Sequence, residues 1–510
     1  MSSLRHQLVL LLLLPGLLLA PIAPAAAQSG INLPDMGSPS DQVMSKDQEA
    51  QIGRMVLRQL REAGKIVEDP LVDEYIQDIG HRLAGHAHDG DFRFRFFVVD
   101  DPAINAFAVP GGYIGVNRGL IEASRNESEL AGVLAHEIAH VTQRHISRSI
   151  QASQRSSMMA LASMLAGVII GMAGGGDAAM GAIMMGQGLA MEQQIAYTRS
   201  NEHEADRIGI EVLASAGFDP EGLPRFFEVL QRRYGQARAP QMLQTHPVTT
   251  TRIAEGMARA RQLQDRHERR EDSTSYELIK ARLRVLSSST PDSAVDWFKR
   301  EIEAQSANGD SLGMRYGLAL AQVNRGGVAD IANTTFRELV DAHPEIIQFH
   351  IGLADSYMTN GQAERAIEVY ERAVSLFPRN LPLTIHYSEA LLAQGNPKRA
   401  HRVLLDVLNH VPPTPEQIRL IALAASANGE EAEAHYYMAE YHIVNGNAPL
   451  AMNQLRMALS SADVTSVQRA RFESRIEWIM DVVPPDLRRE LERQEAERGE
   501  RPRDARTSRR

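Results

Sequence analysis

Residues 134–140 read Leu-Ala-His-Glu-Ile-Ala-His, and this stretch predicts both a fold and a chemistry. His136 and His140 are four residues apart, so on a helix they project from one face, one turn from each other. Two imidazole nitrogens placed in this way can hold one metal ion. Glu137 follows His136 directly, and its carboxylate can take a proton from a water molecule that the metal activates. The alternative is a pair of exposed histidines on a surface helix, because so short a pattern also occurs by chance.

The helix that carries this pattern has a recognisable start. Asn126 is a good N-cap, and Glu129 follows three residues later, which is the spacing of a capping box. Leu134, Ile138 and Val141 then form an apolar stripe that can anchor the helix on its other side.

A second segment supplies the acidic residues that a metal site needs. Residues 202–206 read Glu-His-Glu-Ala-Asp and are expected to open a helix, with Ser200 or Asn201 as its N-cap. Glu202 and Asp206 share a face, so Glu202 can be a third ligand and Asp206 can orient a ligating imidazole. Two neutral histidines and one carboxylate leave a zinc ion with net positive charge and an open position. The alternative is a solvated acidic helix start that favours the helix dipole.

Together the two segments carry a family resemblance. They resemble the metallopeptidase family that includes the CAAX prenyl protease and the bacterial heat-shock membrane protease. The resemblance covers nearly the whole mature chain and is closer still to a periplasmic branch in which a tetratricopeptide array follows the peptidase domain. It implies a zincin-type domain with one zinc ion per chain. The matching residues are His136-Glu137-x-x-His140 and Tyr197-Thr198-Arg199-Ser200-Asn201-Glu202-x-x-Ala205-Asp206.

Composition limits the classes of partner. The chain has 510 residues, enough for about three domains. A formal net charge of −10 argues against nucleic acid as a partner and offers no basic surface to anionic lipid. The absence of cysteine excludes a thiolate zinc site and a disulfide framework.

The N-terminal residues predict export. Residues 1–27 combine a short basic start, an apolar run over 8–20 and a small-residue cleavage site that ends at Ala27, as in a signal peptide. The apolar run is too short to span a bilayer, and the cleavage site argues against the alternative, an uncleaved anchor. Residues 28–44 are expected to form a flexible leader, and the mature protein is expected in the periplasm, including association with the outer membrane.

Two helices and two strands are expected before the histidine pattern. The helices cover residues 45–63 and 69–83, and the strands cover 92–99 and 106–116. Pro110-Gly111-Gly112 inside the second strand favours an edge position or a bulge; a hairpin turn without substrate contact is the alternative. In zinc peptidases of this kind an edge strand beside the metal binds an extended peptide. The expected substrate-binding residues, which also match the family's segment, are Ala106, Phe107, Ala108 and Val109.

Residues 158–191 are apolar and rich in Met, Ala and Gly. Neither half reaches the roughly 20 residues of a membrane span. We interpret the segment as a helical hairpin or lid near the cleft, able to bind hydrophobic clients or to make a peripheral membrane contact. A buried hairpin in the domain core remains an equal alternative.

Further site residues follow downstream. A histidine before a proline, such as His246, usually belongs to a capped loop. The resemblance implies instead that His246 occupies the fourth zinc position in a latent state and leaves it when substrate arrives. Arg252 or Tyr197 could stabilise the oxyanion of the scissile carbonyl, and the sequence does not choose between them.

Beyond the predicted peptidase domain (45–270) the periodicity changes. Three sets of residues recur every 34 positions, the tetratricopeptide period, with Gly at the turn, Ala at the helix contact and Pro at the end of each unit. We expect a repeat domain over 276–482 and a disordered charged tail over 483–510. The fold class is therefore mainly α with a small β-sheet, a zincin-type domain followed by an α-solenoid. The three sets are Gly327, Gly361 and Gly395; Ala332, Ala366 and Ala400; and Pro344, Pro378 and Pro412.

These patterns predict a periplasmic zinc-dependent endopeptidase, with Glu137 and Asp206 as catalytic residues and with His136, His140, Glu202 and, in the latent state, His246 as metal ligands. The resemblance implies a chaperone-like role in quality control and assembly of outer-membrane β-barrel proteins. The implied partners are unfolded or misassembled outer-membrane proteins and the β-barrel assembly machinery, with the lipopolysaccharide translocon as a further candidate. The alternative is a non-proteolytic chaperone or assembly adaptor that acts through its repeats, with a structural or latent zinc site.

Overall fold

The structure is a computed structural model that describes residues 44–87, 92–153, 199–234, 241–264, 271–305, 311–327, 329–409, 413–462 and 464–499. Several predicted features lie outside these residues: the signal peptide (1–27), the leader up to residue 43, the hydrophobic segment 158–191, Tyr197 and the last residues of the tail. Within the described ranges, no helix is both long enough and apolar enough to cross a membrane.

Two N-terminal helices begin where their capping residues predict. α2 (Lys46–Glu62) starts after Ser45, whose hydroxyl accepts a hydrogen bond from the backbone nitrogen of Gln48 while the Gln48 side chain bonds back to Ser45. α3 (Pro70–Ala84) starts after Asp69, whose carboxylate accepts hydrogen bonds from the backbone nitrogens of two residues in its first turn. Their apolar faces are buried, as the helical spacing indicates.

A three-stranded sheet follows, with the order β1-β3-β2. β1 (Arg95–Val99) pairs in parallel with β3 (Tyr113–Asn117), and β2 (Ala106–Val109) pairs with β3 in the antiparallel sense. The expectation of one continuous strand over 106–116 is wrong. Gly111 and Gly112 have φ values of 85° and 86°, so the chain reverses there and forms a β2–β3 hairpin. A side chain at Gly111 would also meet the backbone of Ala50 in α2, because the hairpin packs closely on that helix.

The two edges of this sheet differ. Along the outer edge of β1, the Gln77 side chain bonds both backbone groups of Phe96, and the Val67 nitrogen donates to the Val98 carbonyl (2.9 Å). β2 is the other edge strand, and no described strand pairs with its outer side. The prediction that residues 106–109 form an edge strand therefore agrees with the topology.

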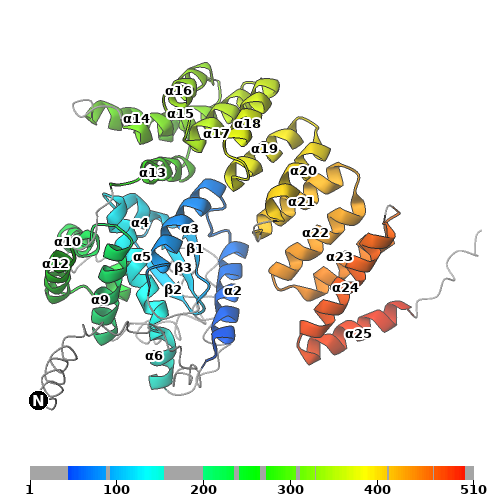
Figure 1. Cartoon of the computed structure of the whole chain (residues 1–510), viewed down its shortest axis with the longest axis horizontal. Helices are drawn as coiled ribbons and strands as arrows, with labels where there is room; N and C mark the ends of the chain where they lie inside the picture. Colours follow the sequence, from blue (N-terminus) through cyan, green and yellow to red (C-terminus); the bar gives the residue numbers. More distant parts are fainter. Residues whose placement is uncertain are drawn as a thin grey trace, which may run out of the picture.

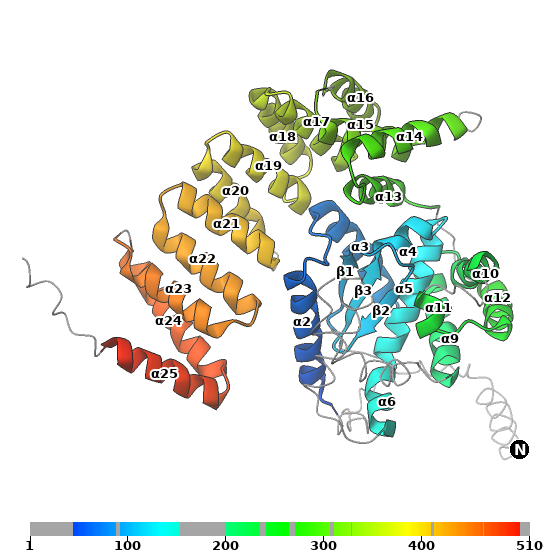
Figure 2. The same cartoon turned by 180° about the vertical axis from the view of Figure 1, so that it is seen from behind.

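The helix of the histidine pattern, α5 (Glu127–Thr142), lies at the centre of the peptidase part. Every one of its residues is buried, because the sheet and α3 pack on one side and two further helices pack on the other (Figures 1 and 2). The remaining helices of this part are α4 (Arg118–Ala123), α6 (His145–Ser153), α9 (Arg199–Ser215), α10 (Gly222–Tyr234), α11 (Gln241–Thr245) and α12 (Thr250–Gln264).

The C-terminal half is an array of antiparallel helices that arches over the peptidase part (Figure 1). Gly327, Gly361 and Gly395 each have a positive φ of 69° to 77° at the turn between paired helices. The glycine series continues 34 residues further on at Gly429 (φ 79°), which the sequence analysis did not include. The helices are α13 (Thr274–Leu286), α14 (Pro291–Gln305), α15 (Leu312–Arg325), α16 (Ala329–Ala342), α17 (Ile347–Thr359), α18 (Ala363–Leu376), α19 (Leu381–Ala393), α20 (Pro397–Leu408), α21 (Pro415–Ala427), α22 (Glu431–Val444), α23 (Ala448–Ser460), α24 (Ser466–Val482) and α25 (Pro485–Gly499).

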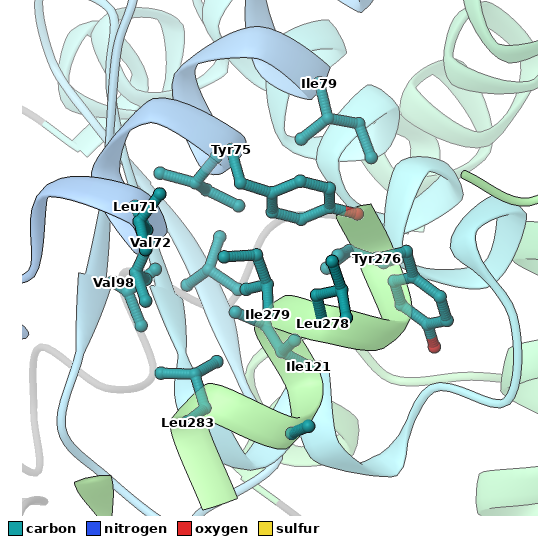
Figure 3. Packing of buried hydrophobic residues seen from close by; sticks show 14 of the residues in the cluster. Leu71, Val72, Tyr75, Ile79, Val98, Ile121, Tyr276, Leu278, Ile279 and Leu283 are labelled. Atoms are coloured by element: carbon teal, nitrogen blue, oxygen red, sulfur yellow. The ribbon is translucent and has the colours of Figure 1, made fainter. Parts of the chain in front are cut away.

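The hydrophobic core continues from the peptidase part into the array. Leu278, Ile279 and Leu283 of α13 pack against Leu71 and its neighbours in α3 (Figure 3). Further along, Arg58 of α2 donates a hydrogen bond to the carbonyl of Asn445 (2.8 Å), so the later repeats touch the peptidase part again. The first repeat helix therefore belongs to the same core as the peptidase helices.

The predicted disordered tail needs correction. Residues 485–499 form helix α25, although nine of these 15 residues are charged. Leu491 is fully buried, and Leu487 packs against the same C-terminal cluster, which includes Ile479 of α24. Two leucines at i and i+4 are enough to seat this helix on its neighbour, and a composition argument does not detect them.

Candidate metal centre

The helical spacing of α5 brings its two histidines together. Asn126 caps the helix by accepting a hydrogen bond from the backbone nitrogen of Glu129 (2.9 Å). The Glu129 carboxylate bonds the backbone nitrogen of Arg125, not that of Asn126, so the capping box is incomplete. One turn of helix separates His136 from His140, and their Nε2 atoms lie 3.0 Å apart. Both side chains are buried.

The facing helix is α9, which brings its acidic residues to the same place. Glu202, Ala205, Asp206 and Gly209 share one buried face, which packs against α5. α9 approaches closely because Gly209 has no side chain: a Cβ there would lie 3.0 Å from the His136 backbone nitrogen. The predicted N-cap was wrong, since Ser200 and Asn201 lie inside a helix that already includes Arg199.

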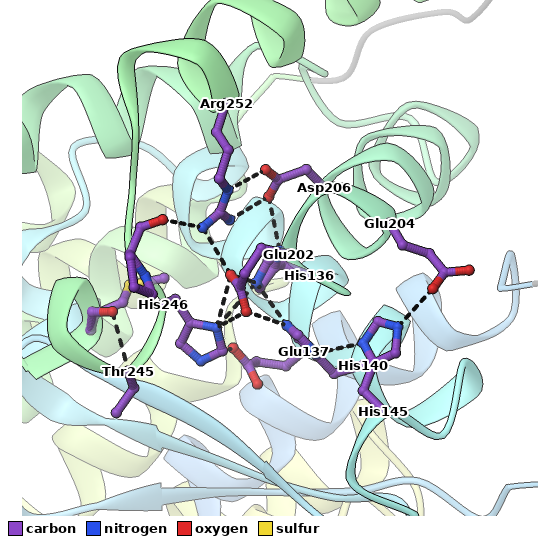
Figure 4. Close-up of polar contacts among 12 residues, drawn as sticks. His136, Glu137, His140, His145, Glu202, Glu204, Asp206, Thr245, His246 and Arg252 are labelled. Atoms are coloured by element: carbon purple, nitrogen blue, oxygen red, sulfur yellow. Dashed lines mark hydrogen bonds and ion pairs between the residues drawn. The ribbon is translucent and has the colours of Figure 1, made fainter. Parts of the chain in front are cut away.

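Four donor groups converge between these helices. His136, His140, Glu202 and His246 each offer one ligand atom, and these atoms all lie within 4.8 Å of one another. Glu202 is 3.6 Å from the Nε2 atoms of both His136 and His140. All four residues are buried (Figure 4). A nitrogen- and oxygen-rich set of this size suits zinc or another divalent transition metal.

His246 enters the cluster from a separate part of the chain. It follows α11 directly, and its backbone nitrogen bonds the Met242 carbonyl (2.8 Å), which holds the residue at the helix end. Its Nδ1 atom is 3.1 Å from Glu202 Oε1 and 3.4 Å from His136 Nε2. The ring therefore lies among the other donors.

Glu137 lies beside the cluster and not within it. Its carboxylate is fully buried, and neither oxygen has a hydrogen-bond partner among the described residues. His246 Nε2 is 3.6 Å from its Oε1. A buried carboxylate without a hydrogen-bond partner is costly unless a cation or a polar ligand compensates it, so the residues present fit a bound metal ion.

The ring of His136 is held from behind by two residues. Its Nδ1 atom is 3.0 Å from Asp206, which in turn receives the Arg252 guanidinium through Nε (2.6 Å) and Nη2 (2.8 Å). Arg252 Nη1 also contacts Glu202 and the Pro247 carbonyl, both at 2.8 Å. These contacts link Arg252 to Asp206 and Glu202, and its predicted oxyanion role stays a prediction. Tyr197, the other oxyanion candidate, lies outside the described residues.

The ring of His140 has a corresponding support that the sequence analysis missed. Its Nδ1 atom lies 2.7 Å from Nδ1 of His145 in α6, and His145 Nε2 lies 3.0 Å from Glu204 of α9 (Figure 4). Glu204 sits two residues from Glu202 in the acidic segment that had been singled out. Glu204 lies on a different face of the helix from Glu202, so the segment has a second polar face, but the local sequence does not indicate which histidine Glu204 contacts.

Electrostatics within the cluster favour replacement of a proton by a cation. Burial lowers the pKa of His136, but hydrogen bonds to Asp206 and Glu202 outweigh it and raise that pKa to about 9. Burial raises the pKa of Glu202, yet the nearby His246 and His136 hold it well below its usual range. Burial and the charge of His136 lower the pKa of His140. The metal-free cluster thus holds a proton close to an ionised carboxylate, where a divalent ion would bind instead.

The predicted substrate-binding residues lie on the strand nearest this centre. β2 packs against α5, and Ala106 and Ala108 belong to the same core as Leu134. Phe107 points to the other face of the sheet, where its ring is 6.0 Å from that of Phe97. The strand is therefore fixed relative to the metal helix, while its outer edge carries no described strand.

Comparison with known proteins agrees with this geometry. Residues 70–260 match the model of peptidase family M48, and residues 316–380 and 357–424 match tetratricopeptide repeat models. The chain is 34% identical over 476 residues to the beta-barrel assembly-enhancing protease of Escherichia coli, and this alignment covers 92% of this chain and 95% of the relative. A Vibrio cholerae protein to which the same name is provisionally given is 36% identical over 466 residues, covering 90% and 95%.

A more distant relative matches a smaller share of the chain. The mitochondrial metalloendopeptidase OMA1 of Arabidopsis thaliana is 25% identical over 217 residues, covering 42% of this chain and 41% of the relative. The similarity to the bacterial relatives, in contrast, runs through both the metal centre and the repeats. The chain therefore belongs to the beta-barrel assembly-enhancing proteases, a group of metalloendopeptidases within peptidase family M48.

Proposed function

We propose that the protein is a zinc-dependent endopeptidase of the periplasm that acts on outer-membrane β-barrel proteins during their assembly. The observation that carries the proposal is the convergence of His136, His140 and Glu202 within ligand distance of one another, with the buried carboxylate of Glu137, which has no hydrogen-bond partner among the described residues, beside them. Two imidazoles and one carboxylate are a ligand set that zinc peptidases use, and they leave a coordination position for chemistry.

Each residue then has a defined task in peptide hydrolysis. A bound zinc ion supplies a Lewis acid that polarises the scissile carbonyl and lowers the pKa of water. Glu137 takes a proton from the attacking water and delivers it to the leaving amide nitrogen. Asp206 orients the ring of His136 through its Nδ1 atom, and Arg252 holds Asp206 in place.

The substrate backbone is best placed along the outer edge of β2, residues Ala106–Val109. The outer edge of β1 is already bonded by Gln77 and Val67, so it offers no row of unpaired backbone groups. β2 packs against α5, which puts an added strand near the metal centre. An extended, unfolded segment fits such an edge better than a folded domain does.

His246 is proposed to be a latent-state ligand. Its ring lies among the other donors and beside Glu137, so in this position it excludes the substrate carbonyl and the attacking water. Substrate binding would then have to displace His246 before hydrolysis begins. A protease that is closed by default would protect other envelope proteins.

Cell location and partners follow from the sequence and from the relatives' names. Residues 1–27 have the features of a signal peptide, which supports a periplasmic location. The relatives are named for β-barrel assembly, and repeat arrays present concave surfaces to proteins. We therefore propose unfolded or misassembled outer-membrane proteins as clients and the assembly machinery as docking partner, with chaperone-like binding through the repeats. The non-proteolytic alternative is not favoured, because the named relatives are proteases.

The test compares the wild-type protein with Glu137→Gln and with a matched control, Glu255→Gln, which changes an exposed carboxylate on α12. Zinc content and degradation of an unfolded outer-membrane barrel protein are measured for all three. We expect one zinc ion per chain in each and a loss of cleavage of at least about a hundredfold in Glu137→Gln alone. Retained cleavage in that variant, or a wild-type protein without bound metal, would refute the proposal.

A further inference from the structure

The turn between α5 and α6 places His145 directly behind the ligating ring of His140. The two Nδ1 atoms are 2.7 Å apart, and the ring planes are inclined by 76°. His145 is fully buried, although it is five residues from His140 and on a different helix. On its far side, Nε2 is 3.0 Å from Glu204, which also receives Arg148 (3.0 Å).

The proton positions along this chain of contacts follow from chemistry. His140 faces His136 and Glu202 with Nε2, so as a neutral ligand it carries its proton on Nδ1. That N–H must donate to His145 Nδ1, which leaves the proton of His145 on Nε2. The second N–H then donates to the Glu204 carboxylate. Each atom has one consistent role, and exchanging any of them would place two protons or two lone pairs face to face.

The turn is built to keep His145 in this position. Arg144 has a positive φ of 53°, which is uncommon for a residue other than glycine. Its guanidinium pairs with the buried carboxylate of Glu49 (2.8 Å) and donates to the Met44 carbonyl (2.7 Å). Ser147 in the first turn of α6 donates to the same carboxylate. α2 therefore secures the turn from outside the metal centre.

The two histidine ligands of α5 thus have supports of parallel design. Behind His136, its ring contacts Asp206, which binds Arg252. Behind His140, its ring contacts His145, which binds Glu204, and Glu204 in turn binds Arg148. Both supporting carboxylates come from α9, the helix that also carries Glu202. The difference is one imidazole inserted between the ligand and the carboxylate.

We propose that His145 is a positioning residue, which fixes the tautomer and ring orientation of the metal ligand His140, and that Glu204 holds His145 for this task. The inference rests on the proposed function of the centre. Hydrogen bonds to the second nitrogen of a ligating histidine typically change metal affinity by about 10- to 100-fold. His145→Leu, which removes the acceptor at similar volume, should therefore weaken zinc binding by about 10- to 100-fold.

The experiment uses the full chain and zinc alone as probe. Zinc affinity is measured by competition with a chelator, melting is measured on the metal-free protein, and absorption spectra are recorded after cobalt substitution. His145→Asn is the rescue variant, because its Oδ1 can take the place of the Nδ1 acceptor. His350→Leu is the matched control, since His350 is a buried histidine bonded to a backbone carbonyl in the repeats. Glu204→Ala tests the outer contact at a half-exposed position and should weaken zinc binding about 3- to 10-fold.

The proposal expects weak zinc binding and an altered cobalt spectrum in His145→Leu, near-normal values in His145→Asn and His350→Leu, and similar metal-free melting in both His145 variants. Wild-type affinity in His145→Leu overturns it. The proposal is also overturned if the Leu and Asn variants bind zinc equally weakly and have equally lowered melting temperatures without metal, because His145 would then have only a packing role. Unchanged zinc affinity in Glu204→Ala overturns the role assigned to Glu204. The Glu204→Ala measurement also remains possible if His145→Leu does not fold. A wild-type protein that binds no zinc instead refutes the proposed function itself.

Discussion

A Cβ atom on Gly209 of α9 would lie 3.0 Å from the backbone nitrogen of His136 in α5. This contact sets the distance between the helix that carries Glu202 and the helix that carries the two histidines. Glu202 lies within reach of the two histidines only because α9 approaches this closely, so the glycine at position 209 helps to shape the candidate metal centre although it offers no donor group.

Gly209→Ala should therefore weaken the centre more than it weakens the fold. The methyl group forces α9 away by a few tenths of an ångström, and overpacking of this kind costs about 1–3 kcal/mol, partly offset by about 1 kcal/mol of helix propensity. We expect roughly tenfold weaker zinc binding in a chelator competition. The control is Gly256→Ala on α12, where a Cβ would meet only side-chain atoms, at 3.2 Å or more. Equal zinc affinity in the two variants would contradict this account of α9.

The buried pair Arg282–Asp69 should couple the unfolding of the repeats to that of the peptidase part. Arg282 of α13 binds the carboxylate of Asp69, the N-cap of α3, at 2.7 Å to 2.9 Å. Arg282→Met leaves that carboxylate buried without its cation, at a cost of about 3–5 kcal/mol. Calorimetry should show one lowered transition for both parts. Arg315→Met removes the cation of a pair with the exposed Glu338 and should cost less than about 1 kcal/mol. Two separate transitions, with only the repeats lowered, would show that the parts fold independently.

Local geometry explains what could be predicted from the sequence. His136 and His140 are one helical turn apart, so their common face follows from helix geometry alone, and so does the place of Glu137 beside that face. The glycines of the repeats could be found because the period is constant and each turn needs a positive φ. Glu202 could be proposed from the acidic helix start at 202–206, with a solvated helix start as the alternative, whereas the role of His246 came from the family resemblance, because the spacing along the chain does not place it near α5.

Other features depend on tertiary packing and have no local signal. His145 reaches His140 because Arg144 adopts a left-handed conformation that Glu49, almost a hundred positions earlier in the chain, stabilises. The contacts of Arg252 with Asp206 and Glu202 depend on the packing of α12 against α9, which the sequence does not show. Composition predicts disorder for α25, because the burial of its two leucines depends on α24 and has no signal in the local sequence.

Glu74 should make stability fall with rising pH. Burial, and secondly the negative charge of Asp78, raise the pKa of this carboxyl to about 7 from an ordinary value of 4.5, and Asn380, the N-cap of α19, donates a hydrogen bond to it (3.0 Å). Because the folded state has the higher pKa, it binds more protons than the unfolded state between pH 4.5 and about 7. Stability therefore decreases as the pH rises through this window and is level above it. Denaturant unfolding of Glu74→Gln should show a flatter pH profile and a gain of about 1–3 kcal/mol at pH 8. Glu338→Gln, at an exposed position, should leave the profile as it is; an unchanged profile in Glu74→Gln would exclude the assignment.

His246→Ala should change zinc affinity and proteolysis in opposite directions. The variant loses one of four converging donors, so zinc binding should weaken, while the position that the ring occupies becomes accessible to substrate and water. We expect degradation of an unfolded barrel protein to rise several-fold at saturating zinc. His350→Ala, which removes a buried histidine from the repeats, should change neither quantity. The opposite signs separate a latent-state ligand from a catalytic one: if His246 served catalysis or substrate binding, its removal would lower degradation even with zinc fully bound, and the latent-state hypothesis would have to be abandoned.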